Sequence, residues 1–342
     1  MKKILVFMMI LVMMISCVGC STGSKDNAEE RTVVDMRGVS VKVPAEINSY
    51  AVYWVGGTDI VAMLDGMKGI CAYPETSAGF PYLEKIYPNI KDCKVLSKDD
   101  VSAEEIISTG AQVLFVRYSD NEELFKQLED AGIAVIDIEF NDYDALAKAV
   151  DVVADVFGTD ETKKKAKAYR NYLQVAIKES EAVVANISDD DKPTIITIRD
   201  AETLKAYGPG RFSGSWVNYV GAKSCLEMDD PNGYVSLSDE QLMEYDPDYI
   251  VFALENQAAA FTSNSKYKEL SSCKNGNVFN SPSVVNTWSN QGAESVLQLK
   301  WGLRYISNVQ NLDMENIVKE FYLQFYEYEL SDEEIKNILD IK

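Results

Sequence analysis

The sequence predicts an α/β protein of two similar lobes joined by one long helix. Two stretches, 102–116 and 238–252, carry this prediction because they align without a gap. Each opens with a serine followed three residues later by Glu or Gln, a capping signature, and ends in a run typical of a buried strand. One recurrence at this distance is not a solenoid, whose periods are much shorter, so it favours two related lobes. Chance similarity between two helix–strand units is the alternative explanation.

Apolar runs alternate with helical patterns through the first half of the chain. This alternation favours a mostly parallel sheet with helices on both faces, and we predict a first lobe over residues 31–158. An alternating segment at 31–43 is typical of an edge hairpin. The predicted strands are 51–55, 69–72, 113–116 and 134–138, and the predicted helices are 58–64, 121–131 and 143–157.

The second lobe is predicted over residues 188–342. Its expected strands are 193–198, 249–254 and 277–280, and its expected helices are 294–305, 313–328 and a last one capped by Ser331.

The connection between the lobes, 159–187, is a helical pattern that no glycine or proline interrupts as far as residue 184. At about 1.5 Å per residue this stretch would form a rod of about 39 Å. Such a rod predicts small rocking of the lobes and not a wide hinge motion.

The first residues are typical of a signal peptide, which we assign to residues 1–19. Two lysines, Lys2 and Lys3, precede an apolar run at 4–15 that is too short to span a bilayer as a mature helix. The chain is therefore expected to act outside the cytoplasm.

The small and polar residues after this run resemble the lipobox of bacterial lipoproteins. Gly19 precedes Cys20 and Ser21 follows it, so Cys20 is the expected lipidated residue, with Cys17 as the weaker alternative. Residues 20–30 would then tether the protein to the extracytoplasmic face of the cell membrane through acyl chains. An ordinary secreted protein is the other interpretation.

The chain is strongly acidic, with a formal net charge of −21 at pH 7. Removal of residues 1–19 takes away two lysines and no acid, which makes the charge more negative still. Such a surface repels nucleic acid and anionic lipid, and it favours a soluble monomer.

The chain contains no histidine. This absence excludes Ser-His-Asp and Cys-His catalysis, HExxH zinc hydrolysis and histidine-rich metal capture. We therefore expect no enzyme, no resident metal and no cofactor. The cysteines beyond the signal region have no zinc spacing, and one disulfide per lobe or unpaired buried thiols remain equally open for Cys71, Cys93, Cys225 and Cys273.

Several segments in order resemble one known family, the class III substrate-binding proteins of ABC importers. Residues 32–44 are similar to its opening hairpin, 246–251 to its Pro-Asp strand element, and 288–301 to its late cleft segment, while the single interlobe helix is its hallmark. The chain departs from the pattern at 110–112, which lacks Pro-Asp, and in a longer tail at 311–342.

The resemblance implies two Rossmann-like lobes, a ligand between them, and delivery of that ligand to a permease and its ATPase. In this family each lobe presents a glutamate that forms a salt bridge to the permease. The gapless repeat places these positions at Glu104 and Glu240.

Ligand contacts are expected at the carboxyl ends of the strands, in the cleft. Arg117 and Arg199 directly follow predicted strands, and Arg211 lies in a glycine-containing loop. Arginine and aromatic side chains together suit a bulky, flat, anionic ligand. Each residue taken alone could instead belong to the core or to a surface ion pair. The expected ligand-binding residues are Trp54, Tyr73, Arg117, Arg199, Arg211, Trp216 and Trp288.

The family delivers ferric siderophores, haem, cobalamin and related chelates. Because the chain has no histidine to ligate haem iron, we expect a metal chelate, with a ferric siderophore foremost. A corrinoid or an oxyanion such as molybdate is the alternative ligand. A sensor or adhesion lipoprotein that uses the same fold without a transporter is the alternative class.

Overall fold

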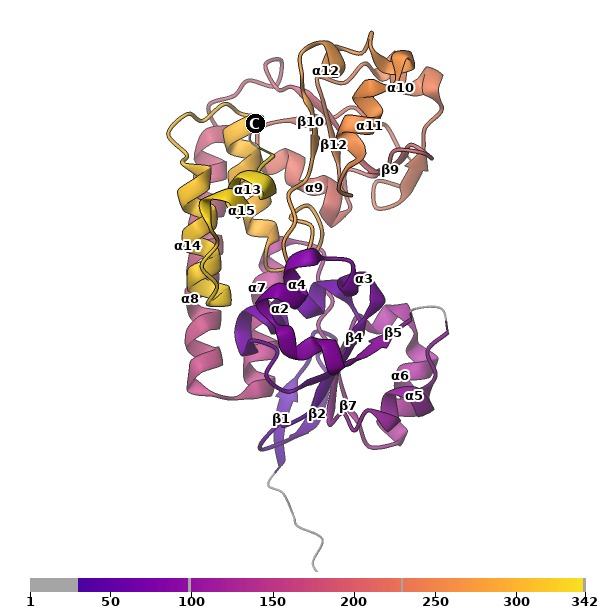
Figure 1. Cartoon of the computed structure of the whole chain (residues 1–342), viewed down its shortest axis with the longest axis vertical. Coiled ribbons are helices and arrows are strands. Elements are labelled where there is room, and N and C mark those ends of the chain that lie inside the picture. Colours follow the sequence, from indigo (N-terminus) through magenta and orange to yellow (C-terminus); the bar gives the residue numbers. More distant parts are fainter. Residues whose placement is uncertain (1–29, 98–99, 229, 341–342) are drawn as a thin grey trace, which may run out of the picture.

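The structure, a computed structural model, describes residues 30–97, 100–228 and 230–340. Two α/β lobes lie one above the other, and α8 (Asp160–Val184) runs along one side of both (Figure 1). The predicted fold class is confirmed. The signal peptide, the tether up to residue 29 and the two cysteines Cys17 and Cys20 lie outside the described residues.

The N-terminal lobe is built on a five-stranded parallel sheet with the order β5-β4-β3-β6-β7. Apolar clusters cover both of its faces, and the antiparallel hairpin β1–β2 packs at the foot of the lobe. The strands are β1 (Glu30–Val34), β2 (Ser40–Pro44), β3 (Tyr50–Val52), β4 (Ile70–Pro74), β5 (Lys94–Leu96), β6 (Val113–Val116) and β7 (Ala134–Asp137). The helices are α2 (Val55–Asp65), α3 (Glu75–Ala78), α4 (Pro81–Ile86), α5 (Ala103–Ser108), α6 (Glu122–Asp130) and α7 (Tyr143–Phe157).

The C-terminal lobe has a mixed sheet with the order β11-β9-β8-β12-β13, and β10 pairs with β8. Strands β9 and β11 are antiparallel, and the sequence did not predict them because three residues carry too little periodicity. The strands are β8 (Thr194–Asp200), β9 (Lys205–Tyr207), β10 (Lys223–Ser224), β11 (Tyr234–Ser236), β12 (Tyr249–Phe252) and β13 (Val278–Asn280). The helices are α9 (Phe212–Tyr219), α10 (Asp239–Tyr245), α11 (Gln257–Ser263), α12 (Ser271–Lys274), α13 (Ser295–Tyr305), α14 (Met314–Tyr326) and α15 (Asp332–Ile338).

The repeated units have the same structure in the two lobes. Ile106 in α5 and Leu242 in α10 are both fully buried at equivalent positions. Each helix is followed by a residue in the left-handed backbone region, Gly110 with φ of 74° and Asp246 with φ of 38°. Strands β6 and β12 then begin at equivalent residues.

The departure from Pro-Asp in the first unit is compensated by a side chain. In the C-terminal lobe, Asp248 accepts hydrogen bonds from the backbone N–H and the hydroxyl of Thr194, both at 2.8 Å. In the N-terminal lobe, Gln112 Oε1 accepts the backbone N–H groups of Asn48 at 2.8 Å and Ser49 at 3.2 Å. Gln112 therefore holds the neighbouring strand in register as the aspartate does.

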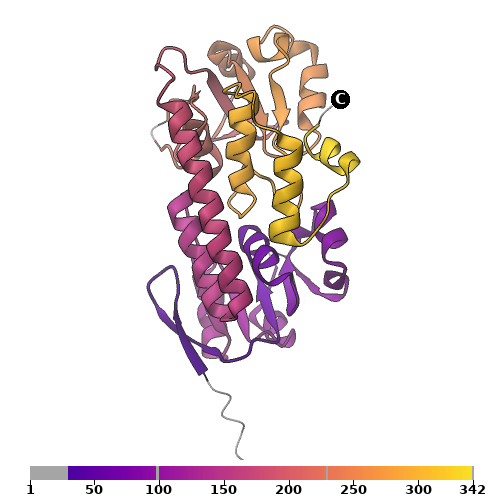
Figure 2. The same ribbon diagram turned by 90° about the vertical axis from the view of Figure 1, so that its left-hand side faces the viewer.

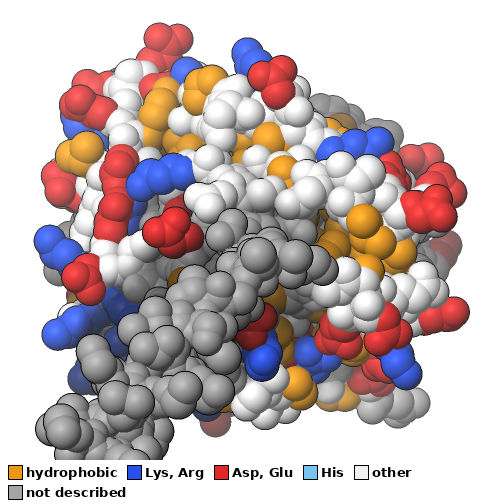
Figure 3. All heavy atoms as spheres, turned by 90° about the horizontal axis from the view of Figure 1, so that it is seen from below, with side chains coloured by type: hydrophobic (Ala, Val, Ile, Leu, Met, Phe, Trp, Pro, Cys, Tyr) orange, Lys and Arg blue, Asp and Glu red, His pale blue; other side chains and the backbone are white. Residues whose placement is uncertain are grey.

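Helices α8, α13 and α14 lie side by side across the lobes (Figure 2). The long tail also connects the lobes, because Glu334 of α15 forms an ion pair of 2.5 Å with Lys85 of α4. Within the described ranges no helix has both the length and the apolar character needed to cross a bilayer. Acidic and basic side chains are interspersed on the visible part of the lower face (Figure 3).

The four described cysteines, two in each lobe, are free thiols, so neither disulfide is formed. Burial raises the pKa of Cys225 to about 12 and also raises the pKa values of Cys93 and Cys273. Thiols that stay protonated at neutral pH are poor nucleophiles, so these side chains act as small core residues.

A buried pair of carboxylates joins the two lobes. Asp59 of α2 accepts the backbone N–H of Glu294 at 2.9 Å, and both side chains are fully buried. Two tyrosines of α14 donate to the pair: Tyr326 to Asp59, and Tyr322 to Glu294 at 2.6 Å. The carboxylate of Glu294 also accepts two backbone N–H groups at 2.8 and 2.9 Å, which satisfies its oxygens.

Two glycines let the lobes approach closely at this junction. A Cβ atom on Gly56 would lie 2.6 Å from the carbonyl oxygen of Gln291. A Cβ atom on Gly292 would lie 2.3 Å from a carboxylate oxygen of Asp59. Any larger residue would push the lobes apart.

The junction makes stability depend on pH. Burial raises the pKa of Asp59 to about 6, and burial together with the Asp59 charge raises the pKa of Glu294 well above its usual range. The folded protein therefore binds more protons than the unfolded chain, so stability is full below the ordinary carboxyl pKa and falls as pH rises through the raised values.

We predict that Asp59→Asn removes part of this dependence. The difference in unfolding free energy between wild type and variant should decrease by about 1–3 kcal/mol as pH rises from about 4 to about 7, because only the wild type loses this stabilisation. Urea unfolding across this range measures it, with the exposed Glu320→Gln on α14 as the control. A gap that stays constant with pH would contradict the assignment.

Candidate ligand-binding site

A cavity of about 350 Å³ lies between the lobes. Its lining comes from both of them: the ends of β3, β4 and β6 on one side, and β8, β9, β11 and the start of α9 on the other. Ligands of α/β sheets bind at this edge, beyond the carboxyl ends of the strands. The cavity is the candidate ligand site.

Three arginines converge on the cavity. Arg117 directly follows β6, and Arg211 is the residue before α9. Arg199 is the second-last residue of β8, whereas the sequence predicted that this strand ends at residue 198. Arg117 is neutralised by Asp120 at 2.5 Å. No carboxylate among the described residues forms an ion pair with Arg199 or Arg211.

Arg211 is held in place by the backbone, because its guanidinium donates to the carbonyl oxygen of Asn232 at 2.8 Å. Its loop depends on a close approach at Gly208, where a Cβ atom would lie 2.2 Å from the carbonyl oxygen of Pro231. The two segments therefore fix the guanidinium at the cavity wall.

Aromatic side chains form much of the remaining wall. Trp54 packs on Phe140 with ring centroids 5.3 Å apart, and the Arg117 guanidinium lies 5.7 Å from the Trp54 ring. Trp54 does not end a strand as expected; it is the N-cap residue of α2. Tyr207 and Tyr234, which face each other across β9 and β11, line the opposite side.

Four of the seven expected ligand-binding residues thus line the cavity, namely Trp54, Arg117, Arg199 and Arg211. The other three, Tyr73, Trp216 and Trp288, do not.

The three excluded aromatic residues are buried in the core. Trp288 donates its indole N–H to Tyr322 at 3.1 Å and so belongs to the lobe junction, while its neighbours Thr287 and Asn290 line the cavity. Trp216 packs edge-on against Trp301 on the inner side of α9. Residues near each of them, Pro74, Ser213 and Thr287, line the cavity, but the direction of each side chain depends on packing that the sequence does not display.

Sequence reasoning missed most of the other lining residues, among them the aromatic pair Tyr207 and Tyr234. Each lies in a strand of three residues, and a lone tyrosine there gives no signal in one sequence. Their pairing across β9 and β11 could be found only from the sheet register.

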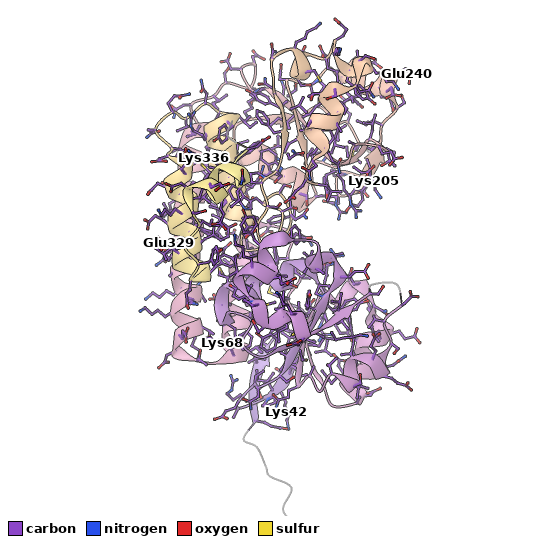
Figure 4. All side chains as sticks on the ribbon, in the orientation of Figure 1. Lys42, Lys68, Lys205, Glu240, Glu329 and Lys336 are labelled. Carbon is purple, nitrogen blue, oxygen red and sulfur yellow. The ribbon has the colours of Figure 1, made fainter. Side chains whose placement is uncertain are left out.

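Glu104 and Glu240 are exposed and have no ion-pair partner in the described part of the chain. Their helices, α5 and α10, lie on the same side of the molecule, opposite α8 (Figures 1 and 4). Glu105, the next residue along α5, is instead paired with Lys94 at 2.6 Å.

No group of three or more Cys, Asp or Glu side chains within the described ranges is arranged to hold a metal ion. The chemistry that the site offers is therefore recognition by cations, aromatic faces and amides.

Residues 51–285 match the periplasmic binding protein family, which is most of the chain. The chain belongs to this family. It is thus a substrate-binding protein of an ABC importer and not an enzyme, and its family acts outside the cytoplasm.

Two relatives match in sequence. The molybdate-binding protein MolA of Haemophilus influenzae is 21% identical, over 92% of this chain and 95% of the relative. The ABC transporter substrate-binding lipoprotein YvrC of Bacillus subtilis, itself uncharacterised, is 23% identical over 62% of this chain and 68% of the relative.

Solved structures share the class III fold. A periplasmic solute binding protein of Veillonella parvula has a TM-score of 0.81 at 20% identity, covering 91% of this chain and 97% of that protein. MolA bound to molybdate gives 0.78 at 19% identity, covering 88% and 99%. The vitamin B12 binding protein BtuF of Vibrio cholerae gives 0.62 at 15% identity, covering 78% and 98%.

Proposed function

We propose that this binding protein captures an anionic metal chelate, foremost a ferric siderophore, and delivers it to a permease and its ATPase. The observation that carries the proposal is the pair Arg199 and Arg211, two guanidinium groups at one cavity wall without a carboxylate partner among the described residues. In a chain with a net charge of −21, such cations favour an anionic ligand.

The size of the cavity supports a chelate. Its volume of about 350 Å³ is in the range of sites for drug-sized organic ligands. Trp54, Tyr207 and Tyr234 add aromatic surface that suits a ligand with flat faces. A corrinoid shares the flat face but gives the arginines less negative charge to bind.

An oxyanion such as molybdate is the second candidate, and the MolA relative favours it. MolA binds molybdate and matches this chain over nearly its whole length. The unpaired arginines suit an oxyanion as well, although a single oxyanion would leave much of the cavity to water.

A ligand panel separates these candidates. Native mass spectrometry and tryptophan quenching with a ferric tris-catecholate, molybdate, a corrinoid and free ferric ion should show the tightest binding for the ferric chelate. Molybdate binding with no chelate binding would favour the second candidate. Tight binding of free ferric ion would contradict the chelate proposal.

The arginines give a mutational prediction for ligand affinity. Arg199→Gln and Arg211→Gln should each weaken binding of the anionic ligand about tenfold or more, because a hydrogen bond to a charged group contributes about 1.5–3 kcal/mol. Isothermal titration calorimetry measures the change. The control is Arg304→Gln, since Arg304 contacts Gln310 outside the cavity. An equal loss in the control would count against a specific role.

We propose that the chain is anchored to the cell membrane by acyl chains on Cys20. The residues 16–24 around it support this placement, as does the similarity of the chain to the lipoprotein YvrC. Labelling of the cells with a palmitate analogue tests the anchor and its position. The label should attach to the wild type and to the matched control Cys17→Ala, but not to Cys20→Ala.

Docking to the permease is proposed to use Glu104 and Glu240. Their exposure and their equivalence in the repeat support this role. Three residues further along each helix, an apolar side chain is exposed to a similar degree, Ile107 to 44% and Met243 to 37%. Both lobes therefore offer the same acidic and apolar pair on one side of the molecule, which suits a partner with two similar contact sites.

A sensor or adhesion lipoprotein would need neither carboxylate. We predict that the double reversal Glu104→Lys and Glu240→Lys abolishes transport, leaves ligand affinity unchanged, and lowers stability by about 0.3–1 kcal/mol for each change. Uptake by reconstituted importer and ligand titration measure the two effects.

The control for this reversal carries the same change in charge on the opposite side, Glu181→Lys on α8 and Glu320→Lys on α14. If the control loses transport equally, net charge and not docking is the cause. If both variants transport normally, the docking assignment is wrong.

A further inference from the structure

Tyr234 has an unusual surrounding of cations. The guanidinium of Arg211 lies 4.1 Å from the centre of its ring, the ammonium of Lys205 lies 4.6 Å away, and the guanidinium of Arg199 lies 5.9 Å away. The three side chains come from three separate elements: β8, β9 and the start of α9. Within the described residues, all three cations lie near the ring of Tyr234 on β11.

Among the described residues, no carboxylate oxygen forms an ion pair with Arg199, Lys205 or Arg211. Asp200 is the nearby acid, and it lies opposite Lys205 in the strand register. Hydrogen bonds from Thr203, together with the charge of Arg199, lower the pKa of Asp200. Like charges at this separation repel one another, and exposed cations of this kind would normally spread into solvent. Some interaction must offset this repulsion to keep them at one wall.

The ring of Tyr234 supplies that interaction. An aromatic face attracts a cation through the negative charge density of its ring, and the attraction is stronger where water is excluded. Tyr234 is 38% exposed, and its ring packs beside that of Tyr207, with centroids 5.3 Å apart. The backbone pairing of Tyr234 with Tyr207 fixes the ring at the cavity wall.

The wall of the N-terminal lobe has a different charge balance. Its arginine, Arg117, is already paired with Asp120, and Glu75 adds a second carboxylate to the lining. The positive charge of the cavity therefore comes from the C-terminal lobe. Lys205 does not line the cavity, but it adds its charge from the side of that lobe that faces the N-terminal lobe (Figure 4).

We propose that Tyr234 is a positioning residue that gathers Arg199 and Arg211 at the cavity wall and Lys205 beside it, and that this cluster of three cations selects ligands with two or more negative charges. This inference rests on the proposed function of the cavity and narrows its ligand class. A multiply charged anion relieves the repulsion among the three cations, whereas a neutral ligand of the same shape does not. Charge, and not shape alone, then decides which ligand is held.

The test compares two ferric chelates of similar size and different charge, with molybdate as a small dianion. A ferric tris-catecholate carries three negative charges, molybdate carries two, and a ferric tris-hydroxamate is neutral. Wild type should bind the anions more tightly than the neutral chelate. Tyr234→Leu should weaken binding of the anions about tenfold more than it weakens binding of the neutral chelate, and it should reduce the dependence of anion binding on salt.

Two further variants separate positioning from structure. Tyr234→Phe keeps the aromatic face and should retain the charge preference. Lys205→Gln should weaken anion binding although its side chain is outside the cavity lining, because its field acts on the ligand. The matched control is Tyr305→Leu. The guanidinium of Arg304 lies 5.6 Å from the Tyr305 ring, and both residues lie outside the cavity between the lobes. Thermal melts check that each variant is folded.

The outcomes distinguish the two proposals. If wild type binds none of the three ligands, the proposed function of the cavity fails. If wild type binds the anions and Tyr234→Leu binds them equally well, the positioning role is overturned. An equal loss for anionic and neutral ligands in that variant also overturns it, because it would show a structural role.

Discussion

The arrangement of this protein depends on one buried contact between the lobes, the Asp59–Glu294 junction. Two carboxylates without a nearby cation are costly to bury, and backbone N–H groups and the hydroxyls of Tyr322 and Tyr326 compensate for them. Asp59 lies in the helix that Trp54 begins, and Glu294 closes the segment that lines the cavity. The same contact that joins the lobes therefore sets the distance between the cavity walls.

The distribution of charge follows a second constraint. The chain is strongly acidic, yet its cavity gathers arginines, and those of the C-terminal lobe lack carboxylate partners among the described residues. An acidic surface repels anions at a distance, so the local cations must hold an anionic ligand at short range. The acidic outer surface therefore keeps the protein soluble, and the arginines of the cavity recognise the anion.

The internal repeat gives both lobes the same helix and strand but different cavity walls. Gln112 and Asp248 perform the same structural task with different side chains. Beyond the repeat the lobes diverge, because β9 and β11 add an antiparallel edge to the C-terminal sheet alone. That edge carries Tyr207 and Tyr234, so the lobe that departs from the common plan supplies most of the positive wall.

The sequence by itself determined most of the longer elements and their order, but not short strands such as β9 and β11. The strand at 113–116 and the helix at 143–157 occur where they were predicted, because periodicity and capping are local properties. Only the tertiary structure decided which side chains face the cavity. Trp216 turns into the core while Tyr234 faces the cavity, and Asp59 meets a partner 235 residues away. Such directions and distant contacts depend on how the elements pack, which no local pattern records.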